Sequence, residues 1–181
     1  MENLTKWMTQ ALRQDKSLPT WLEERKSEWI PLVKNTIFRL FSGEALVIIA
    51  DKEREWFRQY ILASINKGGN RPYLPILSID SLLVSNNKNE LDDTEAKLII
   101  DYLDNMFSNK YFFWYIGRDE RKRSALALSK DSSFLWMFDN NLQNNFTLQS
   151  IDPILDIKLM QMYRNFNLAL DAVMFGHISL E

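Results

Sequence analysis

An uninterrupted apolar stretch in the first third of the chain is the feature that most constrains its fold. Residues 45–50, ALVIIA, contain no polar side chain and run directly into Asp51, where a charged, helix-forming segment begins. Such a run is typical of a strand buried on both faces of a sheet, and the segment after it predicts a βα unit. We therefore expect an α/β protein, whose natural ligand position is the turn that leaves this strand.

That turn lacks the residues that bind phosphate. Phosphate-binding loops offer bare backbone N–H groups at a helix N-terminus, so they depend on small residues that let the ligand approach closely. Residues 51–55 read Asp-Lys-Glu-Arg-Glu instead, without glycine, serine or threonine. The sequence thus predicts a nucleotide- or sugar-binding type of scaffold from which the ligand loop is missing.

Composition excludes several classes of function. The chain has 181 residues, which we interpret as a single domain, and its formal net charge is −2 with no long basic run. Direct nucleic-acid binding normally requires a clustered positive surface, so it is not expected. The absence of cysteine excludes disulfides and thiolate chemistry. We find no signal peptide and no apolar run long enough to cross a bilayer, and we expect a cytoplasmic protein without cofactors.

Two helices are predicted before the first strand, within a prefix formed by residues 1–43. The first lies in residues 2–15, and the second spans about 21–41 with a kink or restart at Pro31 and a stop at Gly43. This prefix is expected to serve packing on the sheet or oligomerisation.

The rest of the chain alternates between strand and helix patterns. It predicts a three-layer α-β-α fold with a parallel sheet of about five strands and a long C-terminal helix. Strands are predicted at 45–50, 74–79, 111–116, 124–128 and 146–149, and helices at 52–65, from Asp92 or Asp93 to about 106, at 134–138 and at about 154–175.

The last helix has clear start signals and too many apolar residues for one face. Asp152 is the expected cap and Pro153 occupies the first position. A second apolar set, which includes Ile157, Met160 and Leu168, lies partly off the main stripe. Such a helix is either central in the domain or packed against another subunit, and we favour the second alternative.

Catalytic chemistry has weak support. Asp51 and Asp80 both follow predicted strands and could together hold Mg²⁺, but simpler roles as a helix cap and a loop acceptor are favoured. The only histidine, His177, has no Gly-x-Ser-x-Gly elbow to serve. The mixed charges of residues 118–123 indicate a solvated face or, less readily, a surface for an acidic partner.

Four segments carry a resemblance to a known family. They are WFRQYIL at 56–62, RPYLPILSID at 71–80, SFLWMFD at 133–139 and DPILDIKLMQMY at 152–163. Together they resemble the HobA family, the DnaA-binding replication initiation factors of Helicobacter and Campylobacter relatives. The resemblance implies a sugar-isomerase-like (SIS), Rossmann-like α/β fold, a homotetramer, and binding to the N-terminal domain of DnaA.

A weaker similarity extends to DiaA, a DnaA-binding SIS-domain protein of enteric bacteria. Its tail resembles residues 171–177 here, and its Leu-Phe pair, associated with DnaA contact, corresponds to Met174 and Phe175, with methionine in place of leucine. SIS domains that bind phosphosugars have a Gly- and Ser-rich loop where this chain has residues 51–55.

The resulting hypothesis is a non-enzymatic regulator of replication initiation that gathers several DnaA molecules as a tetramer, without touching DNA itself. The candidate partner-binding residues are Trp56, Phe57, Arg58, Met174 and Phe175. The main alternative is an SIS-type phosphosugar-binding enzyme or sensor. A third, weaker one is a Mg²⁺-dependent, phosphatase-like activity through Asp51 and Asp80.

Overall fold

A five-stranded parallel sheet forms the centre of the protein. The computed structural model describes residues 2–14, 20–67, 71–82, 91 and 93–180. The strands run in the order β3-β2-β4-β5-β6, all parallel to their neighbours. Their bounds are β2 Ala45–Ala50, β3 Ile76–Ser78, β4 Tyr111–Arg118, β5 Phe134–Phe138 and β6 Asn145–Leu148. Because the winding reverses between β2 and β4, their carboxyl ends form the switch point where open α/β sheets bind ligands.

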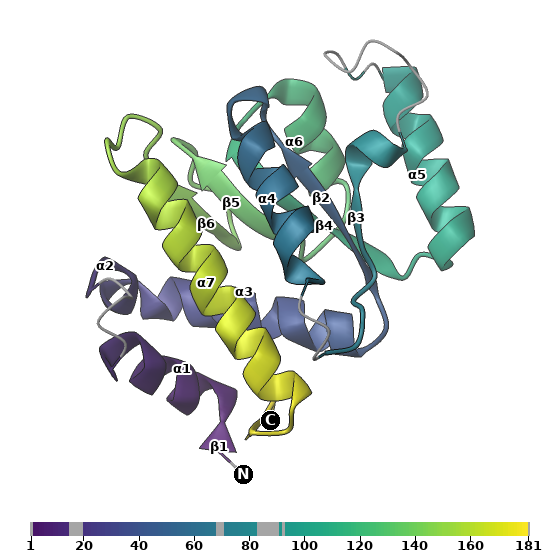
Figure 1. Cartoon of the computed structure of the whole chain (residues 1–181). Helices are drawn as coiled ribbons and strands as arrows, with labels where there is room; N and C mark the ends of the chain where they lie inside the picture. The colour runs from purple at the N-terminus through teal and green to yellow at the C-terminus, as the bar shows by residue number, and fades with distance from the viewer. Residues whose placement is uncertain (1, 15–19, 68–70, 83–90, 92, 181) are drawn as a thin grey trace.

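Helices cover both faces of this sheet, as Figure 1 shows. On one face lie α3 (Lys26–Phe41), α4 (Glu55–Ile65) and α7 (Leu155–Met174), and on the other lie α5 (Asp93–Phe107) and α6 (Arg121–Leu128). The shorter helices α1 (Leu4–Gln14) and α2 (Thr20–Glu24) pack outside α3 and α7. The predicted three-layer fold with a parallel sheet and a long C-terminal helix is therefore confirmed.

The two ends of the described chain meet in a small second sheet. Strand β1 (Glu2–Asn3) pairs in parallel with β7 (Ile178–Ser179), so the N-terminus lies beside the C-terminus below α7. This pairing holds α1 against the end of α7.

Two predicted elements have the wrong type. Residues 124–128, predicted as a strand, belong to α6, and residues 134–138, predicted as a helix, form β5. Short apolar runs do not distinguish a buried strand from a buried helix by periodicity alone. The run FLWMF is buried at every position, as a central parallel strand requires, whereas the alanines and leucines of SALAL are good helix formers. Because the two errors exchange one strand for another, the predicted number of strands in the main sheet is still right.

Several predicted boundaries shift. The second helix of the prefix breaks at Arg25, between α2 and α3, and Pro31 lies inside α3 without interrupting it. The helix predicted from residue 52 opens with a 3₁₀ turn, η1 (Lys52–Arg54), and the strand predicted at 74–79 keeps only β3 before the 3₁₀ turn η2 (Ile79–Ser81). Asp92 lies outside the described residues.

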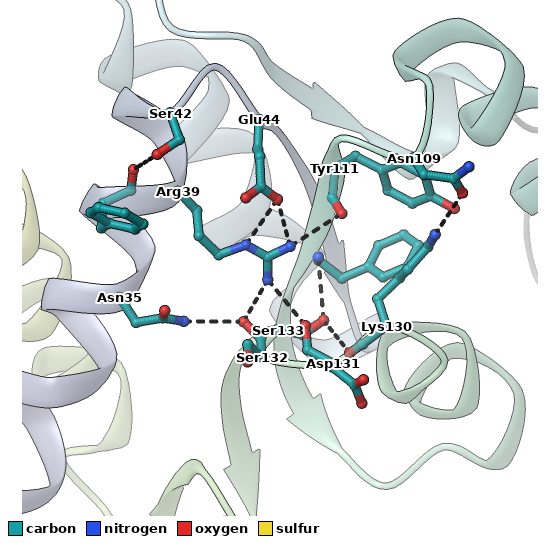
Figure 2. Close-up of polar contacts among 12 residues, drawn as sticks. Asn35, Arg39, Ser42, Glu44, Asn109, Tyr111, Lys130, Asp131, Ser132 and Ser133 are labelled. Atoms are coloured by element: carbon teal, nitrogen blue, oxygen red, sulfur yellow. Dashed lines mark hydrogen bonds and ion pairs between the residues drawn. The ribbon is translucent and has the colours of Figure 1, made fainter.

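The amino edge of the sheet is fastened by Arg39, at the end of α3 (Figure 2). Its guanidinium donates to the Glu44 carboxylate at 2.6 and 2.9 Å and to the carbonyl oxygens of Asp131 and Ser132 at 3.0 and 2.9 Å. It also lies 4.2 Å from the centre of the Phe112 ring. These contacts connect α3 to the starts of β2, β4 and β5, so the polar groups at this edge stabilise the fold.

Candidate functional site

Asp51, the residue that follows β2, lies at the switch point. Its two carboxylate oxygens accept hydrogen bonds from the backbone N–H groups of Arg54 and Arg118, both at 2.9 Å. The Arg54 guanidinium lies 3.6 Å away and is itself buried. Asp51 thus caps the turn behind it, the role that the sequence favoured over Mg²⁺ binding. Burial raises the pKa of the Asp51 carboxyl, against the lowering effect of these hydrogen bonds and of Arg54.

Gly117 in β4 leaves room for this carboxylate. Its φ of +151° is a value that residues with a side chain rarely adopt, and a Cβ at this position would lie 2.6 Å from Cγ and Oδ2 of Asp51. From α6, Arg123 donates a hydrogen bond of 2.8 Å to the carbonyl oxygen of Ala50. Side chains of this chain therefore bind backbone groups at the point where folds of this type hold a small molecule.

Asp51 and Asp80 are committed to different partners. Asp80 forms an ion pair with the Arg58 guanidinium, and Asp51 is held by the groups around Arg54 and Arg118. Among the described residues, no three His, Cys, Asp or Glu side chains are grouped so that they could hold a metal ion. The geometry gives no support to the Mg²⁺ alternative.

An open groove lies between α4 and α7, with a volume of about 630 Å³. Helix α4 contributes Trp56 and Tyr60, and α7 contributes Ile157 and Leu168, all with more than a third of their surface exposed. Helix α7 also brings Asp156 and Arg164 to its lining. Aromatic and aliphatic surface of this kind, with charges among it, is typical of protein-interaction sites.

Side-chain contacts between α4 and α7 hold the wall of the groove in place. The Tyr163 hydroxyl and Ser64 Oγ are 2.8 Å apart and join the two helices, while the Tyr60 ring packs edge-on against Tyr163 at 5.7 Å between ring centres. Burial is the main reason why the pKa of the Tyr163 hydroxyl is raised, so this hydroxyl stays protonated at neutral pH. The groove presents a largely preformed surface.

The structure separates the predicted partner-binding residues. Trp56 lines the groove and has 42 % of its surface exposed. Its neighbour Phe57 is fully buried against Trp136 and Tyr163, and the Arg58 side chain is only 5 % exposed. In this conformation Phe57 has no surface for a partner, and Arg58 turns to the other side of α4.

Met174 and Phe175 lie at the far end of α7. Phe175 is exposed and lies beside the exposed His177, whereas Met174 is partly buried. Ile157 and Met174 are seventeen positions apart, which is about 25 Å along a helix. Trp56 and the tail pair therefore do not form one compact site.

Sequence reasoning left Tyr60, Ile157 and Leu168 out of the predicted site. The available signal was the second apolar set of the last helix, which the sequence assigned to contact with another subunit. Two basic side chains of residues 118–123 form local contacts: the Arg118 guanidinium lies 3.2 Å from the Glu53 carboxylate and 3.8 Å from that of Asp139, and Arg123 donates to the Ala50 carbonyl oxygen.

Comparison with known proteins assigns the chain to a family. Residues 1–180 match the family described as "HobA: DNA replication regulator". The DNA replication regulator protein HobA of Helicobacter pylori is 28 % identical over 187 residues, covering 99 % of this chain and all of the relative.

Solved structures agree with this assignment. A crystal structure of a HobA–DnaA (domain I–II) complex from Helicobacter pylori matches with a TM-score of 0.75 and 28 % identity over 99 % of both chains. Helicobacter pylori HobA matches with a TM-score of 0.72 and 26 % identity, also over 99 % of both chains. Within the described residues no helix is long and apolar enough to cross a membrane. The resemblance found in the sequence is confirmed: this chain belongs to the HobA family of DNA replication regulators.

Proposed function

We propose that this protein regulates the initiation of DNA replication by binding the N-terminal region of DnaA, and that it catalyses no reaction. The likeness over 99 % of the chain to a HobA crystallised with DnaA domain I–II carries this proposal. The contacts of Asp51 support its non-enzymatic part. An SIS-type phosphosugar enzyme needs free N–H donors at the switch point, and here Asp51 accepts from the N–H groups of Arg54 and Arg118.

The groove between α4 and α7 is the surface we propose for DnaA. It is lined by Trp56 and Tyr60 from α4 and by Ile157 and Leu168 from α7. Large aromatic side chains in a concave, partly apolar surface are the usual anchors of a protein interface. Asp156 and Arg164 supply charges that fix the orientation of the partner.

A homotetramer completes the proposed mechanism. Each subunit offers one groove, so a tetramer holds several DnaA molecules close together and raises their effective concentration on DNA. Exposed apolar side chains outside the groove are available for subunit contacts: Phe38 and Phe41 on α3 of the prefix, and Leu98, Tyr102 and Met106 on α5. DnaA, and not this protein, would contact the DNA.

Calorimetric titration with a DnaA N-terminal fragment tests the groove. Ile157→Glu places a charge on its apolar wall and Trp56→Ala removes its largest side chain, so each is expected to weaken binding about tenfold or more. Tyr73→Ala is the matched control, because Tyr73 is 84 % exposed and lies outside the groove.

The outcomes separate the parts of the proposal. Unchanged affinity in both groove variants would move the contact elsewhere on the protein. No DnaA binding by the parent chain, together with thermal stabilisation by a sugar phosphate, would favour the enzyme or sensor instead. Light scattering on the eluting protein measures whether the particle has four subunits.

A further inference from the structure

The groove between α4 and α7 contains two amide side chains whose orientation is fixed by other parts of the chain. Gln161 and Asn167 of α7 both line the groove. Gln161 Oε1 accepts a hydrogen bond of 3.2 Å from the Trp21 indole N–H, and Asn167 Oδ1 accepts one of 2.9 Å from the Arg71 guanidinium. Indole and guanidinium nitrogens only donate, so each amide oxygen must face its donor. Each amide therefore offers its NH2 group, a donor, as its remaining polar end.

Gln161 belongs to a regular stripe along α7. Ile157, Gln161, Arg164 and Leu168 all line the groove and follow at intervals of four, three and four residues, the spacing that places side chains on one face of a helix. Gln161 is half-buried and the other three are exposed. The stripe thus has two hydrogen-bond donors at its centre, one of them a cation, and an aliphatic side chain at each end. Its length along the helix axis is about 16 Å.

The charges of the groove lie at different heights on α7. Asp156 is exposed and lines the groove beside Ile157, at the start of the stripe. It precedes Arg164 by eight positions, which is about 12 Å along the helix axis. A partner carboxylate is therefore attracted to the second half of the stripe and repelled from its start. Charge complementarity of this kind selects a partner and fixes its direction.

On the basis of the function proposed above, we propose that the groove binds an acidic segment of the DnaA N-terminal region with apolar residues on both sides of its carboxylate. The carboxylate accepts hydrogen bonds from the Gln161 NH2 group and from the Arg164 guanidinium, which is a charge-assisted contact. The apolar residues of the segment pack on Ile157 and on Leu168. Trp21 is a positioning residue, because it holds the Gln161 amide in the donating orientation.

Calorimetric titration of the full-length protein with a DnaA N-terminal fragment tests the sign of the partner's charge. Arg164→Gln removes the cation, and Gln161→Glu replaces the NH2 donor by a carboxylate that still accepts from Trp21. Each variant is expected to weaken binding about tenfold, the effect of losing one charge-assisted hydrogen bond. Asp156→Asn is the matched control on the same helix: an acidic segment binds it equally well or more tightly, whereas a basic segment binds it more weakly.

Trp56→Ala distinguishes a failure of this proposal from a failure of the proposed function. If Trp56→Ala weakens binding while Arg164→Gln and Gln161→Glu do not, the groove binds DnaA without an acidic contact, and the proposal is overturned. Weaker binding by Asp156→Asn also overturns it. If none of the four variants changes the affinity, DnaA binds elsewhere and the groove itself is the wrong surface. A thermal melt shows whether each variant is folded, and Arg164→Gln, at an exposed position, keeps the test valid if Gln161→Glu unfolds.

Discussion

The crevice at the switch point and the groove between α4 and α7 differ in what occupies them. The crevice holds a buried carboxylate, two backbone donors and a buried guanidinium. The groove is lined by aromatic and aliphatic side chains that remain exposed. In this chain Asp51, at the customary ligand position of an open α/β sheet, is bound by the protein's own backbone, and the surface that we propose for a partner lies on the helices. Substitutions should therefore affect folding at the first site and binding at the second.

Gly117→Ala should have the largest effect on folding. The added Cβ would lie 2.6 Å from the Asp51 side chain and would occupy a strained φ of +151°. Backbone strain and overpacking together are expected to cost about 3 kcal/mol or more of unfolding free energy, measured by urea denaturation.

Gly43→Ala is the matched control for this prediction. Gly43 also has a positive φ, +84°, but nothing lies within 4 Å of a Cβ at that position. Only the backbone cost of about 1 kcal/mol is expected. If both variants lose the same unfolding free energy, the contact between a Cβ at position 117 and Asp51 does not destabilise the protein.

Asp51→Ala should come next. It leaves the Arg54 and Arg118 N–H groups without their acceptor and removes a carboxylate beside the buried Arg54 guanidinium. We expect a loss of about 2–3 kcal/mol in chemical denaturation. Glu53→Gln removes a neighbouring carboxylate that is 59 % exposed, and it should cost less than about 1 kcal/mol. If Asp51→Ala leaves the unfolding free energy unchanged, the hydrogen bonds and the ion pair of Asp51 do not stabilise the protein.

The pH dependence of stability isolates the Asp51 carboxyl. Because burial raises its pKa, its contribution to stability is fully present below the unfolded pKa and is lost as the pH rises through the folded pKa. Relative to Asp51→Asn, the parent protein should therefore lose unfolding free energy as the pH rises above about 4. If the parent protein instead gains unfolding free energy relative to Asp51→Asn as the pH rises, the fold stabilises the charged form of the carboxylate.

A small effect on stability is expected at the groove. Trp56→Ala removes a half-exposed ring that packs on Phe57 at 5.4 Å between ring centres. Its cost in unfolding free energy should be about 1 kcal/mol, although the same variant is expected to weaken DnaA binding strongly. A thermal melt measured beside the titration separates the effect on stability from the effect on binding. A large loss of stability would mean that Trp56 mainly stabilises the fold.

The strongest sequence signals were those that depend on one segment alone. The run at 45–50 is a fully buried strand, Asp51 caps the turn after it, and Gly43 ends α3 with a positive φ. The errors at 124–128 and 134–138 arose where a short apolar segment fits either element, and only its neighbours decide between them. Phe57 and Arg58 were candidates for partner contact because sequence spacing cannot tell which side of α4 meets the sheet.

By itself the sequence determined the α/β class, the family and the loss of the phosphate loop, because each follows from residue types in local order. The tertiary structure alone decided that Asp51 packs against Gly117, since these residues are far apart in the chain. The tertiary structure also decided that Trp56 and Ile157 line the same groove, while Arg58 lies on the other side of α4. Contacts between distant segments depend on how the layers pack, and packing is a property of the whole chain.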